Sequence, residues 1–398
     1  MSKVEARASS GKRVAVIVHI FSHYRRPVYF EMIENSPHHY EFIGTDHDFN
    51  TGIKVINDFP EGRFHKVKAW KFRSIVFMPG TIRAAIGSRY DTLIILGNAK
   101  WPTMWLTAII ARLRGKRVLM WAHGWLSDEK GVTRLIRDTF YKLAHGLLVY
   151  NRRSKEIGVS HGFDPKRIHV VYNSLDSVTQ IAVRDSITDA DIERARVGYF
   201  PGRQDLPILT AVTRITASKK LDLLIDAAAL LEERGTPVNV LIVGDGPEKA
   251  RLEQLAKKNG VSACFAGAVY DERTLGVIFK ATDLTVMPGA IGLLVMHSLV
   301  FGTPVVSHNN FDNQGPEYEA IVDGVTGGFF EENSVDSLAE TVNRWLNDNE
   351  AKERGREESR AVIERFYNPF TQAGAINRAV SGLDADDSFE FASLGRDA

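Results

Sequence analysis

The sequence predicts an α/β protein made of two doubly wound, Rossmann-like parallel-sheet domains. The chain has 398 residues, more than one hydrophobic core usually supports. Strand-length runs rich in β-branched residues alternate with helical segments along most of it. These runs are continuously apolar, as in strands that helices cover on both faces of a parallel sheet.

The N-terminal half contains six runs of strand length. They span residues 13–20, 40–44, 91–97, 117–124, 146–150 and 168–173. Helical segments separate them, and "WPTMWLTAIIARLRG" (101–115) ends in the basic residues and Gly that close a helix.

A second series of strands follows in the C-terminal half. Its runs span residues 207–215, 238–246, 263–269, 283–289, 303–308 and 326–330. The segment "KLDLLIDAAALLEERG" (220–235) has apolar residues at helical spacing. We therefore expect a second doubly wound sheet.

The two series set the expected domain boundaries. An N-terminal domain covers 1–178, a polar linker 179–206 and a C-terminal domain 207–360. Helices over 361–382, broken at Pro369, are expected to cross back to the N-terminal domain. The acidic segment 383–398 lacks a packable pattern and is expected to form a loose tail.

Charge is distributed unevenly along the chain. Residues 1–180 carry 28 Lys and Arg against 15 Asp and Glu, and residues 181–398 carry 22 against 34. The basic half is expected to meet something anionic. The single cysteine, Cys264, excludes an internal disulfide and a thiolate metal cluster, and no apolar run is long enough to span a membrane. We expect a cytoplasmic protein that can also work at the inner face of the cell membrane.

Residues that directly follow strands are the candidates for ligand binding, because α/β sheets bind ligands at the carboxyl ends of their strands. Arg214 follows one such strand and Lys219 precedes a helix. Two cations and a helix N-terminus suit a diphosphate; the alternative is a pair of solvated loop charges. Gly244 and Gly246 allow a ligand to approach the backbone, or simply form a tight turn.

Six segments in this order resemble family 4 of the retaining glycosyltransferases, which have the GT-B fold with two Rossmann-like domains facing a central cleft. They are "VTRITASKKLDLLIDAAALL", "LIVGDGPEKARLEQLA", "FAGAV", "ATDLTVMPG", "GLLVMHSLVFGTPVVS" and "EAIVDGVTGGFF". The likeness covers most of residues 205–345. Over the N-terminal half it is looser and depends on "WAHG" and "GFDPKRIHVVYNSLD".

The resemblance implies a catalytic set of Arg214, Lys219 and His123. The two cations would neutralise the donor diphosphate as it leaves, and His123 would approach the donor sugar. A histidine satisfied in a strand-end turn is the alternative for His123. No metal or other cofactor is expected, and we interpret "DHD" at 46–48 and "DAD" at 384–386 as solvated acids.

The resemblance also places the two glutamates of the E-x7-E motif at Gly289 and His297. His297 could bind ribose hydroxyls through a ring nitrogen, or could be a buried histidine bonded to a carbonyl. Backbone amides of the loop at Gly289 suit a phosphate or sugar oxygen, and Glu317 or Glu319 could replace the lost acid. The expected donor-binding residues are Gly244, Gly246, Val269, Gly289, Ala290, Ile291, Gly292, Leu293, His297, Glu317 and Glu319.

The N-terminal half is expected to bind the acceptor. The expected contacts are His23, Tyr24, Arg25, Asn98 and Trp125. Lys and Arg mixed with Trp70, Phe72 and Phe77 suit an anionic membrane or a lipid diphosphate. A site for single-stranded nucleic acid and a solvated basic face over core aromatics are the alternatives; we expect no nucleic-acid partner.

Taken together, the residues and the resemblance imply a retaining, metal-independent hexosyltransferase. It would move sugar from a nucleotide-sugar donor to a glycan or lipid-linked saccharide in surface polysaccharide or glycolipid biosynthesis. Loss of both motif glutamates leaves two alternatives: a non-catalytic nucleotide-sugar-binding partner protein, and a GT-B nucleotide-sugar hydrolase or epimerase.

Overall fold

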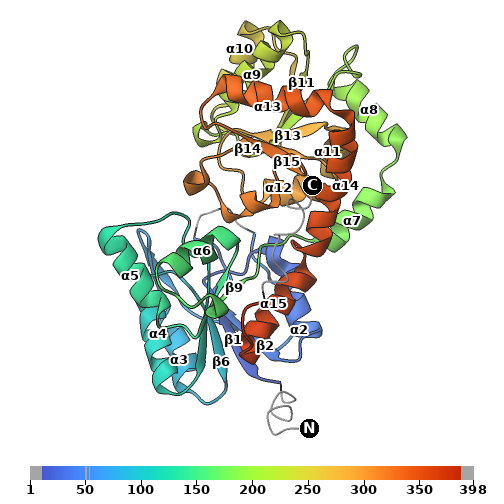
Figure 1. Cartoon of the computed structure of the whole chain (residues 1–398). Coiled ribbons are helices and arrows are strands. Elements are labelled where there is room, and N and C mark those ends of the chain that lie inside the picture. Colours follow the sequence, from blue (N-terminus) through green and yellow to red (C-terminus); the bar gives the residue numbers. More distant parts are fainter. Residues whose placement is uncertain (1–10, 50–51, 53, 387–398) are drawn as a thin grey trace. The chain divides into compact units, whose positions relative to one another are not determined.

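The computed structural model describes residues 11–49, 52 and 54–386 (Figure 1). The described chain divides into two compact units. Unit 1 contains the residues up to Asp176 together with those from Asn368 onward, and unit 2 runs from Ser177 to Tyr367. The N-terminal residues 1–10 and most of the predicted tail (387–398) lie outside the described residues.

Unit 1 is built on a seven-stranded sheet in the order β3-β2-β1-β6-β7-β8-β9. All six neighbouring pairs are parallel. The strands are β1 Arg13–Ile17, β2 His39–Gly44, β3 Phe64–Lys66, β6 Thr92–Leu96, β7 Arg117–Ala122, β8 Gly146–Val149 and β9 Ile168–Val170. All six predicted runs are strands. The added β3 was missed because its sequence, FHK, is short and polar.

Helices cover both faces of this sheet, so successive residues of a strand enter different cores. In β1, Ala15 and Ile17 belong to one hydrophobic cluster, whereas Val14 and Val16 belong to another. The helices are α2 Arg26–Glu34, α3 Gly80–Ile86, α4 Pro102–Leu113, α5 Gly131–Tyr141, α6 Arg152–Ser160 and α15 Pro369–Ser381, with short turns η1 His23–Arg25 and η2 Pro165–Arg167. A hairpin of β4 Trp70–Phe72 and β5 Ile75–Phe77 stands apart from the sheet.

The last helix, α15, belongs to unit 1 although it follows unit 2 in the chain (Figure 1). It packs on α2 and β9. Gln372 anchors it by donating to the carbonyl of Tyr172 over 2.7 Å and accepting from the Ser174 hydroxyl over 2.8 Å. The described start of the tail is also held here, since Asp384 pairs with Lys166 and Asp386 with Arg378.

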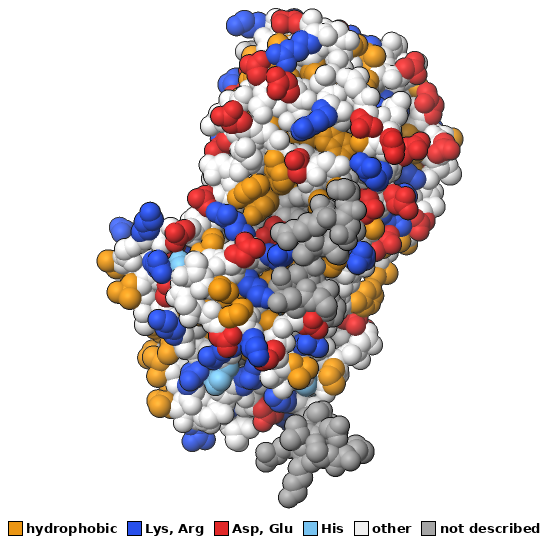
Figure 2. Space-filling model, viewed as in Figure 1, with side chains coloured by type: hydrophobic (Ala, Val, Ile, Leu, Met, Phe, Trp, Pro, Cys, Tyr) orange, Lys and Arg blue, Asp and Glu red, His pale blue; other side chains and the backbone are white. Residues whose placement is uncertain are grey.

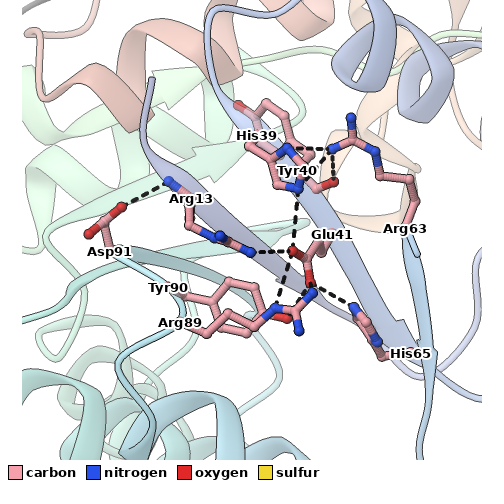
Figure 3. Close-up of polar contacts among 9 residues, drawn as sticks. All are labelled: Arg13, His39, Tyr40, Glu41, Arg63, His65, Arg89, Tyr90 and Asp91. Carbon is pink, nitrogen blue, oxygen red and sulfur yellow. Dashed lines mark hydrogen bonds and ion pairs between the residues drawn. The ribbon is translucent and has the colours of Figure 1, made fainter. Parts of the chain in front are cut away.

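The buried carboxylate of Glu41 in β2 lies at the centre of an ionic cluster in unit 1 (Figure 3). Its carboxylate lies 2.6 Å from His65 Nε2, 2.7 Å from the Tyr90 hydroxyl and 2.7 Å from Arg89. Arg13 of β1 lies 3.2 Å and His39 Nε2 3.3 Å from the same carboxylate. Burial alone would raise the pKa of Glu41, but the hydrogen bonds from Arg89, Tyr90 and His65 lower it to about 2. The cluster joins β2 to β1, β3 and the segment before β6.

Unit 2 contains a six-stranded parallel sheet in the order β12-β11-β10-β13-β14-β15. Its strands are β10 Ile208–Val212, β11 Asn239–Val243, β12 Ala263–Gly267, β13 Leu284–Met287, β14 Val305–His308 and β15 Gly327–Phe330, as predicted. Its helices are α9 Leu221–Glu233, α10 Lys249–Lys258, α11 Glu272–Ala281, α12 Leu294–Val300, α13 Val335–Asn347 and α14 Asn349–Arg365. Short turns are η3 Ala217–Lys219, η4 Phe311–Asn313 and η5 Pro316–Ala320.

The segment expected as a linker over 179–206 is instead largely helical. Helices α7 Ser177–Ser186 and α8 Asp189–Tyr199 belong to unit 2 and pack on α11. Thr188 and Asp191 form a capping box at the start of α8, and Asp191 also pairs with Arg273 of α11 at 3.1 Å. The Thr-x-x-Asp pattern was the available signal. The polar composition hid these helices, because α7 buries only Ser177 and Gln180 and α8 has no fully buried residue.

Candidate functional site

In unit 2, the loop that carries Arg214 and Lys219 is held between two neighbouring loops. A Cβ on Gly244 would lie 1.8 Å from the Thr213 carbonyl oxygen, and one on Gly246 would lie 2.1 Å from that of Ile215. Both contacts are with backbone, so only glycine fits. The sequence predicted that a ligand could approach the backbone at these glycines. In the structure it is the neighbouring loop that approaches them, and this contact fixes the backbone on either side of Arg214.

The other side of this loop rests on Gly289. The Gly289 N–H donates to the Lys219 carbonyl over 3.0 Å, and the Lys219 ammonium donates to the Ala290 carbonyl over 2.7 Å. Burial lowers the pKa of Lys219. Lys219, which was predicted to contact a diphosphate, thus joins the loop after β10 to the loop after β13.

Arg214 presents its charge differently. It is exposed, and its side chain makes no hydrogen bond or ion pair with the residues that the structure describes. Helix α9 begins a few residues later, at Leu221. The loop therefore offers one unpaired guanidinium and one anchored ammonium beside a helix N-terminus, a combination that suits an anion.

The structure explains why position 289 carries no glutamate. A Cβ there would lie 2.3 Å from the Ser218 carbonyl oxygen and 2.8 Å from the Lys219 Cα. Real Cβ atoms do not come this close to backbone, so any side chain would displace the loop that carries Lys219.

The amides of the 289–292 loop are less available than the sequence suggested. The Gly289 N–H is taken by Lys219, and the Ile291 N–H donates to the Gln314 side chain over 3.0 Å. We correct the expectation for these two amides: they hold the loop rather than a ligand. Gly292 has φ +59° and lies one residue before Leu293, the N-cap of α12.

Gln314 is a positioning residue that the sequence did not single out. Besides accepting from Ile291, its side chain donates to the Ser307 hydroxyl over 2.9 Å and to the His308 carbonyl over 3.1 Å. It therefore joins the 289–292 loop to the end of β14. Its place in "HNNFDNQGPEYE", directly after a strand, was the available signal.

His297 is paired with a carboxylate rather than with the carbonyl that was the expected alternative. Its Nε2 lies 2.8 Å from Glu272 Oε1, and its ring packs on Phe279 and Phe301. Burial would raise the pKa of Glu272, but hydrogen bonds from His297 and Gln180 hold it below its usual value. The structure thus supplies a carboxylate from α11 next to the position of the second missing glutamate.

The remaining donor-side residues lie in separate places. Glu317 is buried in η5. A Cβ on Gly315 would lie 2.9 Å from the Glu317 Oε2 and 3.6 Å from the Gly292 Cα, so the carboxylate and the 289–292 loop lie on the same side of Gly315. Glu319 is half-buried in the same turn, and Val269 is half-buried after β12. Of the two acids proposed to replace the motif glutamate, Glu317 is the one brought beside the 289–292 loop.

In unit 1, a cavity of about 560 Å³ opens at the carboxyl ends of β1, β6 and β7. Three of its lining residues, His19, Asn98 and His123, each follow one of these strands. Burial lowers the pKa of His19 to about 4, so its ring is neutral at pH 7. Neutral imidazole and amide groups suit the hydroxyls of a sugar or another polar ligand.

Tyr150 contacts both Arg25 and His123, of which only His123 is among the residues that line this cavity. The Arg25 guanidinium lies 4.9 Å from the centre of the Tyr150 ring, and the His123 ring lies 5.2 Å from it, edge to face. Two residues predicted from distant parts of the sequence therefore share one neighbour.

Two other residues predicted to contact the acceptor, Trp125 and His23, do not line the cavity. Trp125 is fully buried, donates its indole N–H to Asp138 over 2.8 Å and packs on Tyr141 and Phe163. It supports the His123 turn from the core and does not reach a ligand, which corrects that expectation. His23 is exposed in η1 and is not among the residues that line the cavity.

The acidic motif at 46–48, interpreted as solvated, makes local contacts. Asp46 pairs with Lys66 and His47, and the Asp48 carboxylate accepts from the Gly52 N–H over 2.7 Å. Within residues 11–49, 52 and 54–386, no group of three or more His, Cys, Asp or Glu side chains is arranged to hold a metal ion.

Comparison with known proteins finds similarity over most of the C-terminal unit. Residues 200–362 match the family model described as glycosyl transferases group 1. Unit 2 is therefore similar to the group 1 glycosyl transferases. Alpha-D-kanosaminyltransferase of Streptomyces kanamyceticus is 32% identical over 191 residues, which cover 46% of this chain and 48% of that protein. A GDP-mannose-dependent phosphatidylinositol dimannoside mannosyltransferase of Mycobacterium tuberculosis is 33% identical over 102 residues, 25% of this chain and 26% of its own length.

The chain thus spans about half the length of these curated relatives or less. Structural similarity extends further. The Anabaena protein HepE, solved in complex with UDP, superposes with a TM-score of 0.68 at 18% identity, covering 94% of this chain and all of that one. This likeness shows the GT-B fold. No described helix is long and apolar enough to cross a membrane.

Proposed function

We propose that this protein is a retaining glycosyltransferase that moves a sugar from a nucleotide-sugar donor to a glycan or lipid-linked saccharide. The observation that carries the proposal is the Arg214–Lys219 loop, fixed against Gly289 in the unit that matches the group 1 family. Two cations on a loop with a fixed backbone, beside a helix N-terminus, can stabilise the charge that develops as a diphosphate leaves.

The donor is assigned to unit 2. The diphosphate would meet Arg214, the ammonium of Lys219 and the start of α9. The nucleoside would extend towards His297 and Glu272, whose carboxylate can accept a hydrogen bond from a ribose hydroxyl while His297 orients it. HepE was solved with UDP, which supports a nucleoside diphosphate as the leaving group.

The acceptor is assigned to the cavity of unit 1. Its hydroxyl would attack the anomeric carbon on the face from which the diphosphate departs. The new C–O bond forms as the sugar–phosphate bond breaks, and the hydroxyl proton passes to the leaving phosphate oxygen. No protein nucleophile takes part, and His123 contributes a polar contact to the reacting sugar.

A lipid-linked acceptor is favoured by the surface beside this cavity. Trp101 lines the cavity and donates to the Ser74 carbonyl in the β4–β5 turn over 3.3 Å. On that hairpin Trp70 is 57% exposed and Phe72 65% exposed, with Lys71 and Arg73 adjoining them. Exposed aromatics beside cations are typical of surfaces that rest on anionic membranes. Figure 2 shows further basic side chains interspersed with apolar ones on unit 1.

The test begins with a thermal-shift screen against UDP, GDP, ADP, CMP and dTDP and their common sugars. A ligand that binds the native state raises the melting temperature by mass action. The donor so identified is then incubated with the enzyme and membrane lipid extracts in EDTA, and NMR reads the anomeric configuration of the product. Retained configuration without metal is expected.

Two outcomes would sink the proposal. Donor binding without turnover across acceptors would identify a non-catalytic nucleotide-sugar binder, which the absence of glutamates at Gly289 and His297 favours. Release of free sugar at a rate that lipid extract does not change would identify a hydrolase.

A further inference from the structure

Arg25, in the turn after β1, is a cation surrounded by aromatic rings. Its guanidinium lies within 6 Å of three ring centres: Tyr24 at 5.6 Å, Trp121 at 5.7 Å and Tyr150 at 4.9 Å. The stem enters this box from η1, and the residue stays partly exposed.

All of these partners are neutral. Arg25 makes no ion pair with an acidic side chain in the part of the chain that the structure describes, and its buried Nε has no hydrogen-bond partner there. Taking a cation partly out of water without a counter-charge is unfavourable, and contact with aromatic faces offsets only part of that cost. Burial acts to lower the pKa of Arg25, but the opposite effect of the surrounding tyrosines is larger. The pKa is raised overall, and the side chain stays charged.

The neighbouring arginine shows the usual arrangement. Arg26 makes a two-pronged contact with Asp58, with Nε at 3.0 Å and Nη2 at 2.8 Å from the same oxygen. Arg25 has an equally planar fork but no such carboxylate. A guanidinium held in place with open donors is suited to an oxyanion supplied from outside.

The position of the box indicates which ligand would supply that oxyanion. Trp121 and Tyr150 lie at the ends of β7 and β8, and Tyr150 also packs on His123, which lines the unit 1 cavity. We propose that Arg25 is an anion-recognition residue of unit 1, and that the acceptor carries a phosphate or carboxylate group that pairs with it. The assignment of this anion to the acceptor rests on the proposed function, but anion binding at Arg25 can be tested without measuring turnover.

The test measures binding of small oxyanions to the full chain by isothermal titration calorimetry. Methyl phosphate represents a phosphate ester, acetate a carboxylate, and UDP the donor diphosphate. The wild type is expected to bind methyl phosphate or acetate, and whichever binds more tightly identifies the source. Arg25→Gln should weaken that binding about 10- to 100-fold, as loss of a charged hydrogen bond does. UDP affinity should be unchanged.

Matched variants keep the result interpretable. Arg26→Gln removes an adjacent arginine already paired with Asp58 and should leave methyl phosphate binding as in the wild type. Arg25→Lys keeps the charge but loses the fork, so it should weaken binding less than Arg25→Gln and serves if the Gln variant misfolds. Near-UV circular dichroism checks the fold.

Three results would overturn the inference. The first is wild-type protein that binds neither methyl phosphate nor acetate at millimolar concentration. The second is equal binding by wild type and Arg25→Gln. The third is an Arg25→Gln variant that weakens UDP as much as methyl phosphate, which would assign the residue to the donor. None of these bears on sugar transfer, so the proposed function stands or falls separately.

Discussion

Gly289 lies directly against Lys219: its N–H donates to the Lys219 carbonyl over 3.0 Å, and a Cβ at 289 would lie 2.8 Å from the Lys219 Cα. Gly289→Ala should therefore lower stability by about 1 to 3 kcal/mol, as overpacking does, and Gly289→Glu should lower it further without improving turnover. Thermal melting checks this. Gly198→Ala in α8, where a Cβ meets nothing within 4 Å, is the control and should not be destabilised. An unaltered melting temperature for Gly289→Ala would show that the loop adjusts freely.

Arg214→Ala and Lys219→Ala should each lower turnover about 10²- to 10³-fold, because each removes charge stabilisation in the transition state. Steady-state kinetics with the donor from the thermal-shift screen measures the effect. Lys220→Ala is the matched control, because the Lys220 ammonium is paired with Glu332 at 2.8 Å. Wild-type turnover in Arg214→Ala would show that the diphosphate binds elsewhere.

His297 and Glu272 should behave as a coupled pair. His297→Ala and Glu272→Gln should each weaken UDP binding, and the double variant should be less impaired than the sum of the two, with a coupling of about 1 kcal/mol. Calorimetric titration with UDP supplies the cycle. Strictly additive effects would mean that the two side chains act on the nucleotide independently.

Glu41→Gln should destabilise unit 1 by about 1 to 2 kcal/mol, because the half-exposed cations of Arg13 and Arg89 lose the buried carboxylate that they share. Urea unfolding followed by circular dichroism measures the loss. Glu31→Gln on α2, where the acid hydrogen-bonds only Asn35 on the surface, is the control. A loss no greater than in this control would mean that water replaces the lost carboxylate.

Unit 1 should lose stability between pH 6.5 and about 4. Burial lowers the pKa of His19 and of His169 to about 4, with Arg117 and Lys155 adding repulsion at His169. The unfolded chain therefore takes up protons near pH 6.5 that the folded chain accepts only near pH 4, so acid favours unfolding in this window. His169→Gln should reduce the slope of melting temperature against pH. An unchanged slope in a His19→Gln, His169→Gln double variant would contradict this assignment.

The sequence by itself determined the sheets. All twelve strand-length runs are strands, because a parallel strand buried on both faces must be apolar along its whole length, and such a run is visible without any tertiary information. Strand ends also located Arg214, Lys219, Asn98 and His123, because α/β sheets present ligand groups there.

Tertiary structure decided which of these residues act on one another. The sequence could not show that Gly244, Gly246 and Gly289 pack on the loop carrying Arg214 and Lys219, because these contacts join different strands. It could not show that Glu272 pairs with His297, that Gln314 accepts a hydrogen bond from Ile291, or that Arg25 packs on Tyr150. The segment predicted as a linker forms helices α7 and α8. Hydrogen bonds and close packing depend on side-chain directions at distances of about 3 Å, and hydrophobic pattern carries no information at that scale.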